Sequence, residues 1–495
     1  LKVWFFMSTS LRKGAKMKVF IATLWISIRQ GMMNINSLLI TYGPGRIRNI
    51  SLVVIVILSF SHFKSSASAE TSQKTADQNV YDLEGNVTLN RLIEDAIKSN
   101  TKIVAAREAW KATIEGRRVA TGLPDPQFMV TYFPEPIETR NGPQDWNATL
   151  SQGVPYPGKI IKAGEIVDKD SEVARLNLDK TIRDTATKVR IAFYELSYIR
   201  EAKRVAAKNI ELIAHLRKVG ETVYSKDQAA LIDIVKAQSQ EGQLQYDILL
   251  LNELEMTEVT NINSLLNRPP QADIGRLVVP AIRPPAYKLP ELYDLAKLNQ
   301  EEIKMMDSLV NKAEIKVDLA KDQRLPDFKV GVFYAEIGSP DDEPRSDDAS
   351  DDAYGVQFGF TVPIWFGKNK GRINQALAEK SRAIAAKESQ INDTHSNIHS
   401  IYFRLQNALR LITLYKDNLL PQAASSMEMA ETLFREKQTG FSDFIEAQST
   451  WYNFNLAVAR ATADYGKYLA RLEKLIGHGI TKRVPLEALD QKELE

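Results

Sequence analysis

Hydrophobic residues recur along this chain with two different periods, which alternate in a fixed order. In "FKVGVFY" (328–334) and "YGVQFGFTV" (354–362) every second position is apolar, and this alternation predicts β-strands. Farther along the chain, apolar residues recur at every seventh position, namely Leu377, Ile384, Ile391, Ile398, Leu405, Ile412 and Leu419. Such a sustained heptad pattern predicts long supercoiled helices.

The same succession of patterns occurs twice. "ETVYSKDQAALIDIVKAQSQ" at 221–240 returns 210 residues later as "ETLFREKQTGFSDFIEAQST" at 431–450. "LPD" at 123–125 returns at 325–327, and "VPYPGK" at 154–159 returns as "VPIWFGK" at 362–368. Because the shared segments keep their order, they predict duplication of a domain-sized unit rather than a solenoid of short repeats.

Each repeat is predicted to hold an opening helix, two strands, a long helix, a turn and a return helix. The first repeat, 88–277, has strands at 126–133 and 146–154, a long helix at 159–224 and a return helix at 231–266. The second repeat, 288–477, has strands at 327–335 and 354–363, a long helix at 368–434 and a return helix at 441–476. Opening helices are predicted at 89–121 and 289–323, each ended by the proline of "LPD", and the flanking segments are a linker at 70–87, a Pro-rich bridge at 278–287 and a tail at 478–495.

The lengths of these helices explain why one turn is made twice. The long helix at 159–224 would extend about 100 Å, and the return helix is about half as long. We expect the opening helix of the next repeat to supply the missing half by stacking end to end. The chain would then descend from the strands and climb back twice.

The strands have the length of membrane-crossing strands. Each has about nine residues, close to the roughly 9–11 of a tilted strand in a bilayer, and Trp146, Tyr354, Trp365 and Phe366 lie towards their ends. A soluble sandwich would also show alternation. Four strands cannot close a barrel, however, and an open edge is not tolerated in lipid. A membrane barrel would therefore need strands from further copies of the chain.

Charge is distributed unevenly between the first 69 residues and the rest. Residues 1–69 contain nine Lys or Arg and no acidic residue, with Arg46 and Arg48 before an apolar run at 50–60 and a small-residue segment ending at Ala69. This order predicts a signal peptide cleaved after Ala69, started conventionally at Met32 or Met33; a single anchor helix is the alternative. The remainder has 55 basic and 62 acidic residues, so a nucleic-acid partner has no electrostatic support.

The chemistry of the chain excludes several classes of site. The chain has no cysteine, which excludes disulfides, thiolate metal sites and lipidation on an N-terminal cysteine. No Ser-His-Asp set, phosphate-binding Gly loop or pair of catalytic carboxylates occurs, so we predict neither an enzyme nor a cofactor.

The duplicated turns carry the pattern aromatic-x(8)-D-x(3)-A-Q. It occurs as Tyr224, Asp233, Ala237 and Gln238, and again as Phe434, Asp443, Ala447 and Gln448. Together with "LLPQA" at 419–423, "LSQGVPYPGK" at 150–159 and the closing "LEKLIG", the chain resembles the TolC-type outer membrane efflux proteins. The last two segments most resemble the branch of this family that serves heavy-metal efflux.

The resemblance implies a mainly α fold with a membrane β-barrel. Three copies would close a 12-stranded barrel in outer membrane lipid and a coiled helical tunnel in the periplasm. The protein would act as the passive exit duct of a tripartite system, with a periplasmic adaptor and an inner-membrane pump, of the RND type, as partners. The hairpin tips that would dock the adaptor contain Tyr224, Asp227, Gln228, Asp233, Phe434, Lys437, Gln438 and Gly440.

The chain departs from the family pattern at both tips. Many members carry glycine three residues after the tip aromatic, where this chain has Asp227 and Lys437. Gly440 alone would then give flexibility to the second tip.

Two acidic residues are candidates for the tunnel aperture. The family parallel places Asp443 and Glu446 in the tunnel near its closed end, where threefold symmetry would make carboxylate rings that favour cations. The alternative is a solvated helix start, where acidic residues favourably meet the helix dipole. Asp233 and Lys236 hold the corresponding places in the first repeat and are expected to pair between helices.

Two weaker candidates concern metal ions. His395 and His399 have the spacing of two ligands on one helix, but two ligands fall short of the usual three or four, so we predict no metal site there. The acidic loop at 341–352 lacks the spacing of a known calcium loop, and a solvated extracellular loop is the preferred interpretation.

Two other classes of protein remain open. A periplasmic adaptor is also exported and built on a helical hairpin, but it would not be duplicated. A soluble coiled-coil scaffold would leave the alternating strands unexplained. Among ducts, export of metal ions, organic compounds or proteins is not distinguished by the sequence.

Overall fold

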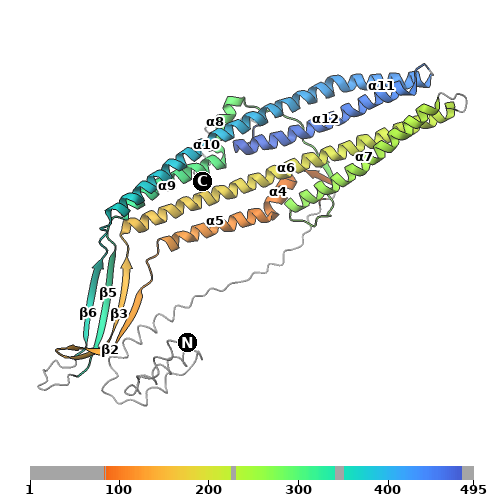
Figure 1. Cartoon of the computed structure of the whole chain (residues 1–495). Coiled ribbons are helices and arrows are strands. Elements are labelled where there is room, and N and C mark those ends of the chain that lie inside the picture. The colour runs from red at the N-terminus through yellow and green to blue at the C-terminus, as the bar shows by residue number, and fades with distance from the viewer. Residues whose placement is uncertain (1–82, 84, 225–229, 340–350, 437, 482–495) are drawn as a thin grey trace, which may run out of the picture. The chain divides into compact units, whose positions relative to one another are not determined.

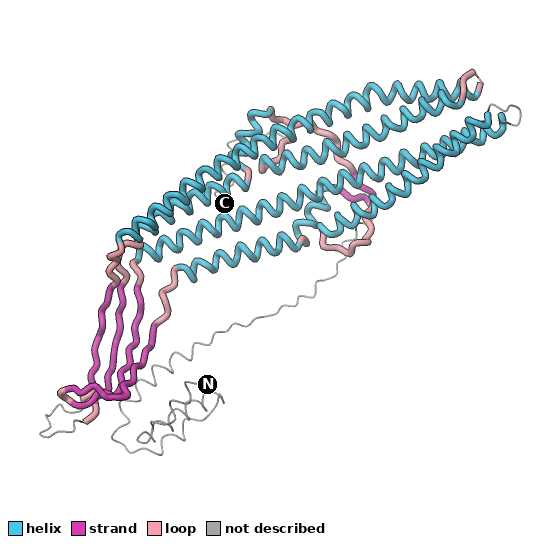
Figure 2. Tube along the Cα trace, viewed as in Figure 1, coloured by secondary structure: helices cyan, strands magenta, loops and turns pink. Residues whose placement is uncertain are grey.

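The computed structural model describes residues 83, 85–224, 230–339, 351–436 and 438–481. The predicted leader and its cleavage site at Ala69 lie outside these ranges. Residues 80–495 form one compact unit, so the two repeats are packed together in one body. In this unit the strands lie at one end, and long helices run from them to the opposite end, where α6, α7, α11 and α12 have their tip ends (Figures 1 and 2).

Both repeats present the same order of elements. The first contains β1 (Asn86–Thr88), α4 (Leu89–Ser99), α5 (Thr101–Ala120), β2 (Gln127–Thr139), β3 (Gly142–Val154), α6 (Pro157–Tyr224) and α7 (Ala230–Leu265). β4 (Arg276–Val278) lies between the repeats. The second contains α8 (Leu289–Asn299), α9 (Glu301–Asp322), β5 (Phe328–Ile337), β6 (Ala353–Phe360), α10 (Phe366–Thr413), the π-helix η2 (Leu414–Leu419), α11 (Leu420–Arg435) and α12 (Phe441–Ile476). The short strands β1 and β4 pair in parallel and tie the predicted linker to the start of the bridge.

The helices form four columns that lie side by side. The helix α6 packs against α5 and α7 on one side and against α9 and α12 on the other, and α10 and α11 pack against α9 and α12. The column order is therefore α5 with α7, then α6, then α9 with α12, and finally α10 with α11 (Figure 1). The first and last columns are the two edges of the body.

Each return helix ends against the opening helix of its own repeat. The Ser99 hydroxyl and the Asn100 amide donate to the carbonyl oxygens of Leu266 and Leu265, at 2.7 and 2.8 Å. In the second repeat, the backbone of Gly477 lies directly against that of Asn299. The expectation that the next repeat supplies the missing half is therefore wrong. Polar side chains at the junction satisfy carbonyl groups that a helix end leaves unpaired.

Each predicted opening helix is in fact two helices. Asn100 and Gln300 are extended, with ψ of 121° and 126°, and separate α4 from α5 and α8 from α9. The Asn100 side chain accepts a hydrogen bond from the Lys102 N–H at 3.0 Å, as an N-cap residue does. The cap starts a new helix, so the continuous helices predicted at 89–121 and 289–323 are wrong.

The π-helix η2 interrupts the long helix predicted at 368–434. Lys159 and Lys368 are 209 residues apart, whereas Glu221 and Glu431 are 210 apart, so the second repeat has one extra residue between these positions. In η2 the Leu420 N–H bonds the carbonyl five residues earlier, and this wider turn accommodates one residue more than an α-turn. Buried positions therefore correspond on both sides of it, as in the pairs Val189/Ile398 and Ile213/Ala423.

The heptad seam of α10 enters the core only along part of its length. Ile391, Ile398, Leu405 and Ile412 are buried, whereas Leu377 and Ile384 are 46% and 49% exposed. A straight α-helix drifts by about 20° per heptad, so a strict seven-residue pattern turns away from one partner along a long rod. Near the strands, Ala376 packs instead against Val317 and Ala320 of α9.

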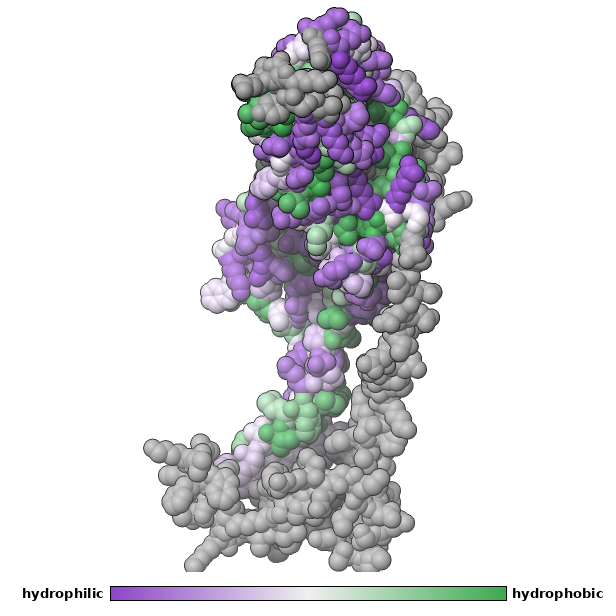
Figure 3. All heavy atoms as spheres, turned by 90° about the vertical axis from the view of Figure 1, so that its right-hand side faces the viewer, coloured by the Kyte–Doolittle hydropathy of each residue, from purple (hydrophilic) through white to green (hydrophobic). Residues whose placement is uncertain are grey.

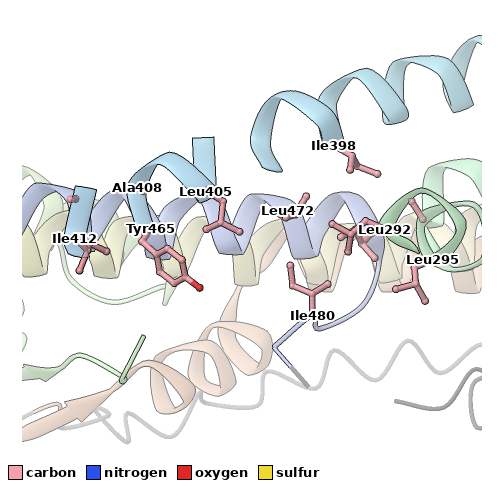
Figure 4. Packing of buried hydrophobic residues seen from close by; sticks show 12 residues of the cluster. Leu292, Leu295, Ile398, Leu405, Ala408, Ile412, Tyr465, Leu472 and Ile480 are labelled. Atoms are coloured by element: carbon pink, nitrogen blue, oxygen red, sulfur yellow. The ribbon is translucent and has the colours of Figure 1, made fainter. Parts of the chain in front are cut away.

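Two hydrophobic clusters at mid-height repeat each other. The cluster of the second repeat includes Leu292, Ala296, Ile398, Leu405 and Ile476 (Figure 4). The cluster of the first repeat holds their counterparts Leu92, Ala96, Val189, Leu196 and Leu266. The duplication therefore extends to the residues that hold the three-helix junction together.

The four long strands form one antiparallel sheet in the order β2-β3-β5-β6. The strands β2 and β3 have 13 residues each, so most of the loop predicted between 134 and 145 is strand, with a bulge between Tyr132 and Ile137. In the second repeat, β5 has 10 residues and β6 has eight, against nine and ten predicted.

One face of this sheet is apolar and exposed. It carries Phe128, Val130, Tyr132, Leu150, Phe328, Val330, Val332, Tyr354, Val356, Phe358 and Phe360. Hydrophobic residues accordingly gather at the strand end in Figure 3, below a mostly hydrophilic helical part. Among the described helices, none is both long and apolar enough to cross a membrane.

Candidate functional site: the hairpin tips

The second tip is built on three aromatic rings. The helix α11 ends just beyond Phe434, and α12 starts at Phe441 after a short turn. The Phe434 and Phe441 ring centroids are 5.3 Å apart, and those of Phe441 and Phe444 are 6.2 Å apart. Phe441 and Phe444 are buried with Ile213 of α6, so the second tip is held against the first repeat.

The turn before α12 does not depend on glycine. Gly440 has φ −77° and ψ 158°, a conformation open to any residue, and a Cβ there would meet nothing within 4 Å. The expectation that Gly440 supplies special turn flexibility is therefore wrong. Gln438 is exposed, and its N–H bonds the Leu433 carbonyl at 2.9 Å to close the end of α11.

Part of the predicted docking surface lies outside the described residues. This is so for Asp227, Gln228 and Lys437. Tyr224 is the last residue of α6, and Asp233 lies in the first turn of α7. The duplicated glutamates Glu221 and Glu431 each pair with an arginine of their own helix, Arg217 and Arg435.

The candidate aperture carboxylates lie at the start of α12. Asp443 and Glu446 are both exposed, and Asp443 is in the first turn, where its charge meets the positive end of the helix dipole. Beside them, Lys236 Nζ of α7 donates to the Ser442 hydroxyl at 2.6 Å. This contact is between helices, as predicted for Lys236, and links the return helices of the two repeats.

The duplicated glutamine of the tip motif has different environments in the two repeats. Gln448 is fully buried, and its amide donates to the Asn209 side chain of α6, which is also fully buried. Gln238 is exposed on α7. In the second repeat this glutamine therefore joins α12 to α6 of the first repeat. In the first repeat its amide is exposed on α7, in an edge column.

A charge cluster near mid-height, away from the tips, escaped prediction from the sequence. Glu195 of α6 accepts from Lys467 at 2.6 Å and from Arg460 at 2.8 Å, both on α12. Burial would raise the pKa of Glu195, but the two cations outweigh burial and lower this pKa below its ordinary value. The sequence feature that could have revealed this cluster is Lys467, a lysine among the apolar residues of "DYGKYLARL". Its side chain is only 7% exposed.

The two histidines contact a tyrosine. The Tyr293 hydroxyl lies 3.2 Å from His399 Nδ1, and its ring centroid lies 4.7 Å from that of His395. Among the described residues no group of three or more potential metal ligands occurs. The pair therefore ties α8 to α10 through Tyr293.

Only the end of the acidic loop is described. The Asp352 carboxylate accepts hydrogen bonds from the Tyr334 hydroxyl and from the Ile337 N–H, the latter at 3.1 Å. These bonds hold the outer ends of β5 and β6 together.

Comparisons with known proteins place the fold. Residues 292–478, most of the second repeat, match the family model "Outer membrane efflux protein". The outer-membrane channel OprN is 17% identical, with a TM-score of 0.67 over 80% of this chain and 91% of OprN. VceC of Vibrio cholerae is 15% identical, with a TM-score of 0.65 over 79% and 96%. CusC is 11% identical, with a TM-score of 0.67 over 79% and 92%. No curated protein matches.

These findings show that the described chain has the fold of outer membrane efflux channels. The predicted resemblance to TolC-type proteins is confirmed, because residues 292–478 match the model of the outer membrane efflux protein family. This likeness agrees with the predicted location in the outer membrane and with the predicted function in efflux. The heavy-metal branch is not singled out, since CusC, OprN and VceC are about equally similar.

Proposed function

We propose that three copies of this chain form the passive exit duct of a tripartite efflux system. The observation that carries this proposal is the pair of unmatched edges. In a single chain, β2, α5 and α7 form one edge, and β6, α10 and α11 form the other. A sheet with an apolar face and open edges is not stable in lipid, whereas three such sheets joined edge to edge close a 12-stranded barrel.

The helical part supports a tunnel continuous with this barrel. The helix α6 has 68 residues and so extends about 100 Å from the strands to the first tip. The two tips would dock the periplasmic adaptor, which connects the duct to an inner-membrane pump of the RND type. Asp443 and Glu446 would line the aperture, and opening would separate the tip hairpins.

A growth experiment would identify the cargo. A strain lacking this protein is compared with the parent on copper, zinc, cadmium and a panel of organic drugs. Loss of metal tolerance alone would assign metal cations as cargo, and sensitivity to drugs alone would assign organic compounds. Unchanged metal tolerance would exclude the metal branch.

Electron microscopy of detergent-extracted protein tests the duct itself. The proposal requires a hollow, threefold cylinder whose length is that of α6 plus a barrel. A single soluble rod that needs no detergent would refute it and favour a periplasmic adaptor or a coiled-coil scaffold. An adaptor is the weaker alternative, because the chain holds two complete hairpins in one body.

A further inference from the structure

A groove of about 950 Å³ lies between α6 of the first repeat and α9 and the end of α12 of the second, three helices that lie side by side (Figure 1). Its α6 wall carries three arginines, Arg175, Arg183 and Arg190. They are eight and seven residues apart in sequence, which corresponds to rises of about 12 and 10.5 Å along the helix. The groove is therefore a strip with a cation at about every second turn of α6.

The three arginines keep hydrogen-bond donors that no residue of the described chain uses. Arg183 Nε donates to Glu301 at 2.6 Å, and Arg190 Nη1 donates to Glu473. The two glutamate side chains are only 9% and 13% exposed, whereas both arginine side chains are 33% exposed and cover them. Arg175 is exposed and makes no hydrogen bond or ion pair within the described ranges. Since a guanidinium has five N–H donors, each arginine can bind a further carboxylate.

Most carboxylates that line the groove are already paired. Besides the two glutamates under the arginines, Glu172 accepts from Lys169 at 2.8 Å, and Asp307 pairs with Lys387. Asp179 also lines the groove; it is exposed and has no ion pair within the part of the chain that the structure describes. An anionic ligand would therefore compete for the arginines chiefly with Asp179.

The described chain reaches residue 481 beside one end of this row of arginines. The Ile480 side chain is fully buried, and its N–H donates to Glu473 at 3.1 Å. Glu473 also accepts from Arg190, and Arg190 and Thr481 line the same smaller pocket. Residues 482–495 lie outside the described residues, and the point from which they start is thus fixed next to Arg190.

The sequence of 482–495 carries negative charges with a matching spacing. Its part "PLEALDQKELE" (485–495) has four acidic residues and one lysine. Three of the acidic residues, Glu487, Asp490 and Glu493, follow one another at intervals of three residues. In an extended chain three residues span about 10–11 Å, close to the rises of about 12 and 10.5 Å between the arginines. The segment and the groove are therefore complementary in both charge and spacing.

We propose that residues 482–495 bind extended in this groove of their own chain and fasten the two repeats to each other. The segment runs from Thr481 towards the strands, antiparallel to α6. The pairs, in order along the segment, are Glu487 with Arg190, Asp490 with Arg183 and Glu493 with Arg175. Arginine suits this role because its planar guanidinium binds carboxylates in a bidentate manner. The contact lies within one chain, so it goes beyond the proposed duct and does not depend on the number of copies.

Disulfide formation tests this register, because the natural chain contains no cysteine. The test variant carries Arg175→Cys with Glu493→Cys, and the control carries Arg175→Cys with Glu487→Cys. In the control the second thiol lies opposite Arg190, about 22 Å along α6 from residue 175, which no disulfide spans. During oxidation in membranes the test pair should close on the order of tenfold faster than the control. A maleimide-linked polymer, which shifts each free thiol on a gel, measures both rates.

Each other outcome of this experiment would overturn the proposal. Equal rates for the two pairs, or free thiols in both, would show that the segment does not lie in this register. Disulfides that join two chains, seen as a doubled mass on non-reducing gels, would show that the groove takes the segment of a second copy. Electron microscopy of the same variants reports on the duct separately, since threefold particles can form whichever result the thiols give.

Charge changes in the test variant show whether the arginines hold the segment. Asp490→Asn should slow disulfide formation about threefold, because it removes the middle ion pair. Asp179→Asn should speed it, because it removes the competing carboxylate. Gln491→Ala, which changes a neutral residue between the paired positions, is the matched control and should leave the rate unchanged. Equal rates for Asp490→Asn and Gln491→Ala would refute the proposed ion pairs.

Discussion

The ring of Tyr194, on α6, fills the space in which a side chain on Gly466 of α12 would begin. The two helices belong to different repeats, so this contact sets how closely the repeats approach. We expect Gly466→Ala to lower the free energy of unfolding by about 1–3 kcal/mol, because the added methyl group must displace the ring. Thermal unfolding followed by circular dichroism measures this change.

A second helical glycine provides the control. At Gly116 of α5, an added Cβ would lie 3.6 Å from Val167 Cγ1 of α6, an ordinary contact. Gly116→Ala should therefore be neutral, or stabilising by up to about 1 kcal/mol, because alanine favours the helix. Equal effects of the two substitutions would show that Tyr194 does not limit the approach of α12.

The buried amides of Asn209 and Gln448 form a second link between repeats. We expect Gln448→Ala to cost about 1–3 kcal/mol, because it leaves the Asn209 side chain buried without its partner. Asn453→Ala, which removes an exposed amide from the same helix, should change stability by less than about 0.5 kcal/mol. Urea unfolding curves measure both, and a Gln448→Ala variant as stable as the Asn453→Ala control would contradict the assigned role.

The Glu195 cluster predicts a loss of stability in acid. The pKa of Glu195 is lower in the folded chain than its ordinary 4.5, so its stabilising contribution is present above that value. It disappears as the pH falls through the folded pKa, because the protonated acid no longer pairs with Lys467 and Arg460. Glu195→Gln should therefore be less stable by about 2 kcal/mol at pH 7 and lose less stability than the parent below about pH 4.5.

The matched control for this pH profile is Glu211→Gln, which removes an exposed carboxylate from the same helix. Melting temperatures between pH 3 and 8, roughly the range in which carboxylates titrate, give the comparison. Parallel pH profiles for the parent and Glu195→Gln would show that this carboxylate does not contribute to the acid sensitivity.

Much of this fold follows from local patterns. The segment "FKVGVFY" forms a strand, as its two-residue period predicts. The helix α12 begins and ends at the predicted residues, Phe441 and Ile476. What local patterns missed depends on contacts distant in sequence. Asn100 ends α4 partly because its amide meets Leu265, and η2 becomes visible only when the two repeats are aligned. Similarly, the tip motif is the same around both glutamines, so it does not predict that Gln448 is buried while Gln238 is exposed.

The candidate aperture carboxylates predict an ionic preference of the proposed duct. Asp443 and Glu446 are exposed in each copy, and three copies would place six negative charges around one opening. Since charged rings select ions of opposite sign, Asp443→Asn with Glu446→Gln should weaken the preference for cations. Planar bilayers under a salt gradient measure this as a smaller reversal potential. Low salt is required, because at 0.1 M charges are screened beyond about 10 Å.

The control removes charge elsewhere on the second hairpin. Glu428→Gln, on the exposed surface of α11, should leave the reversal potential within the error of the parent. Replacement of both aperture carboxylates by alanine should in addition raise the conductance, because shorter side chains widen the opening. An unchanged reversal potential in Asp443→Asn with Glu446→Gln would place these carboxylates away from the constriction. Their role would then be only to stabilise the start of α12, where the helix dipole favours acidic residues.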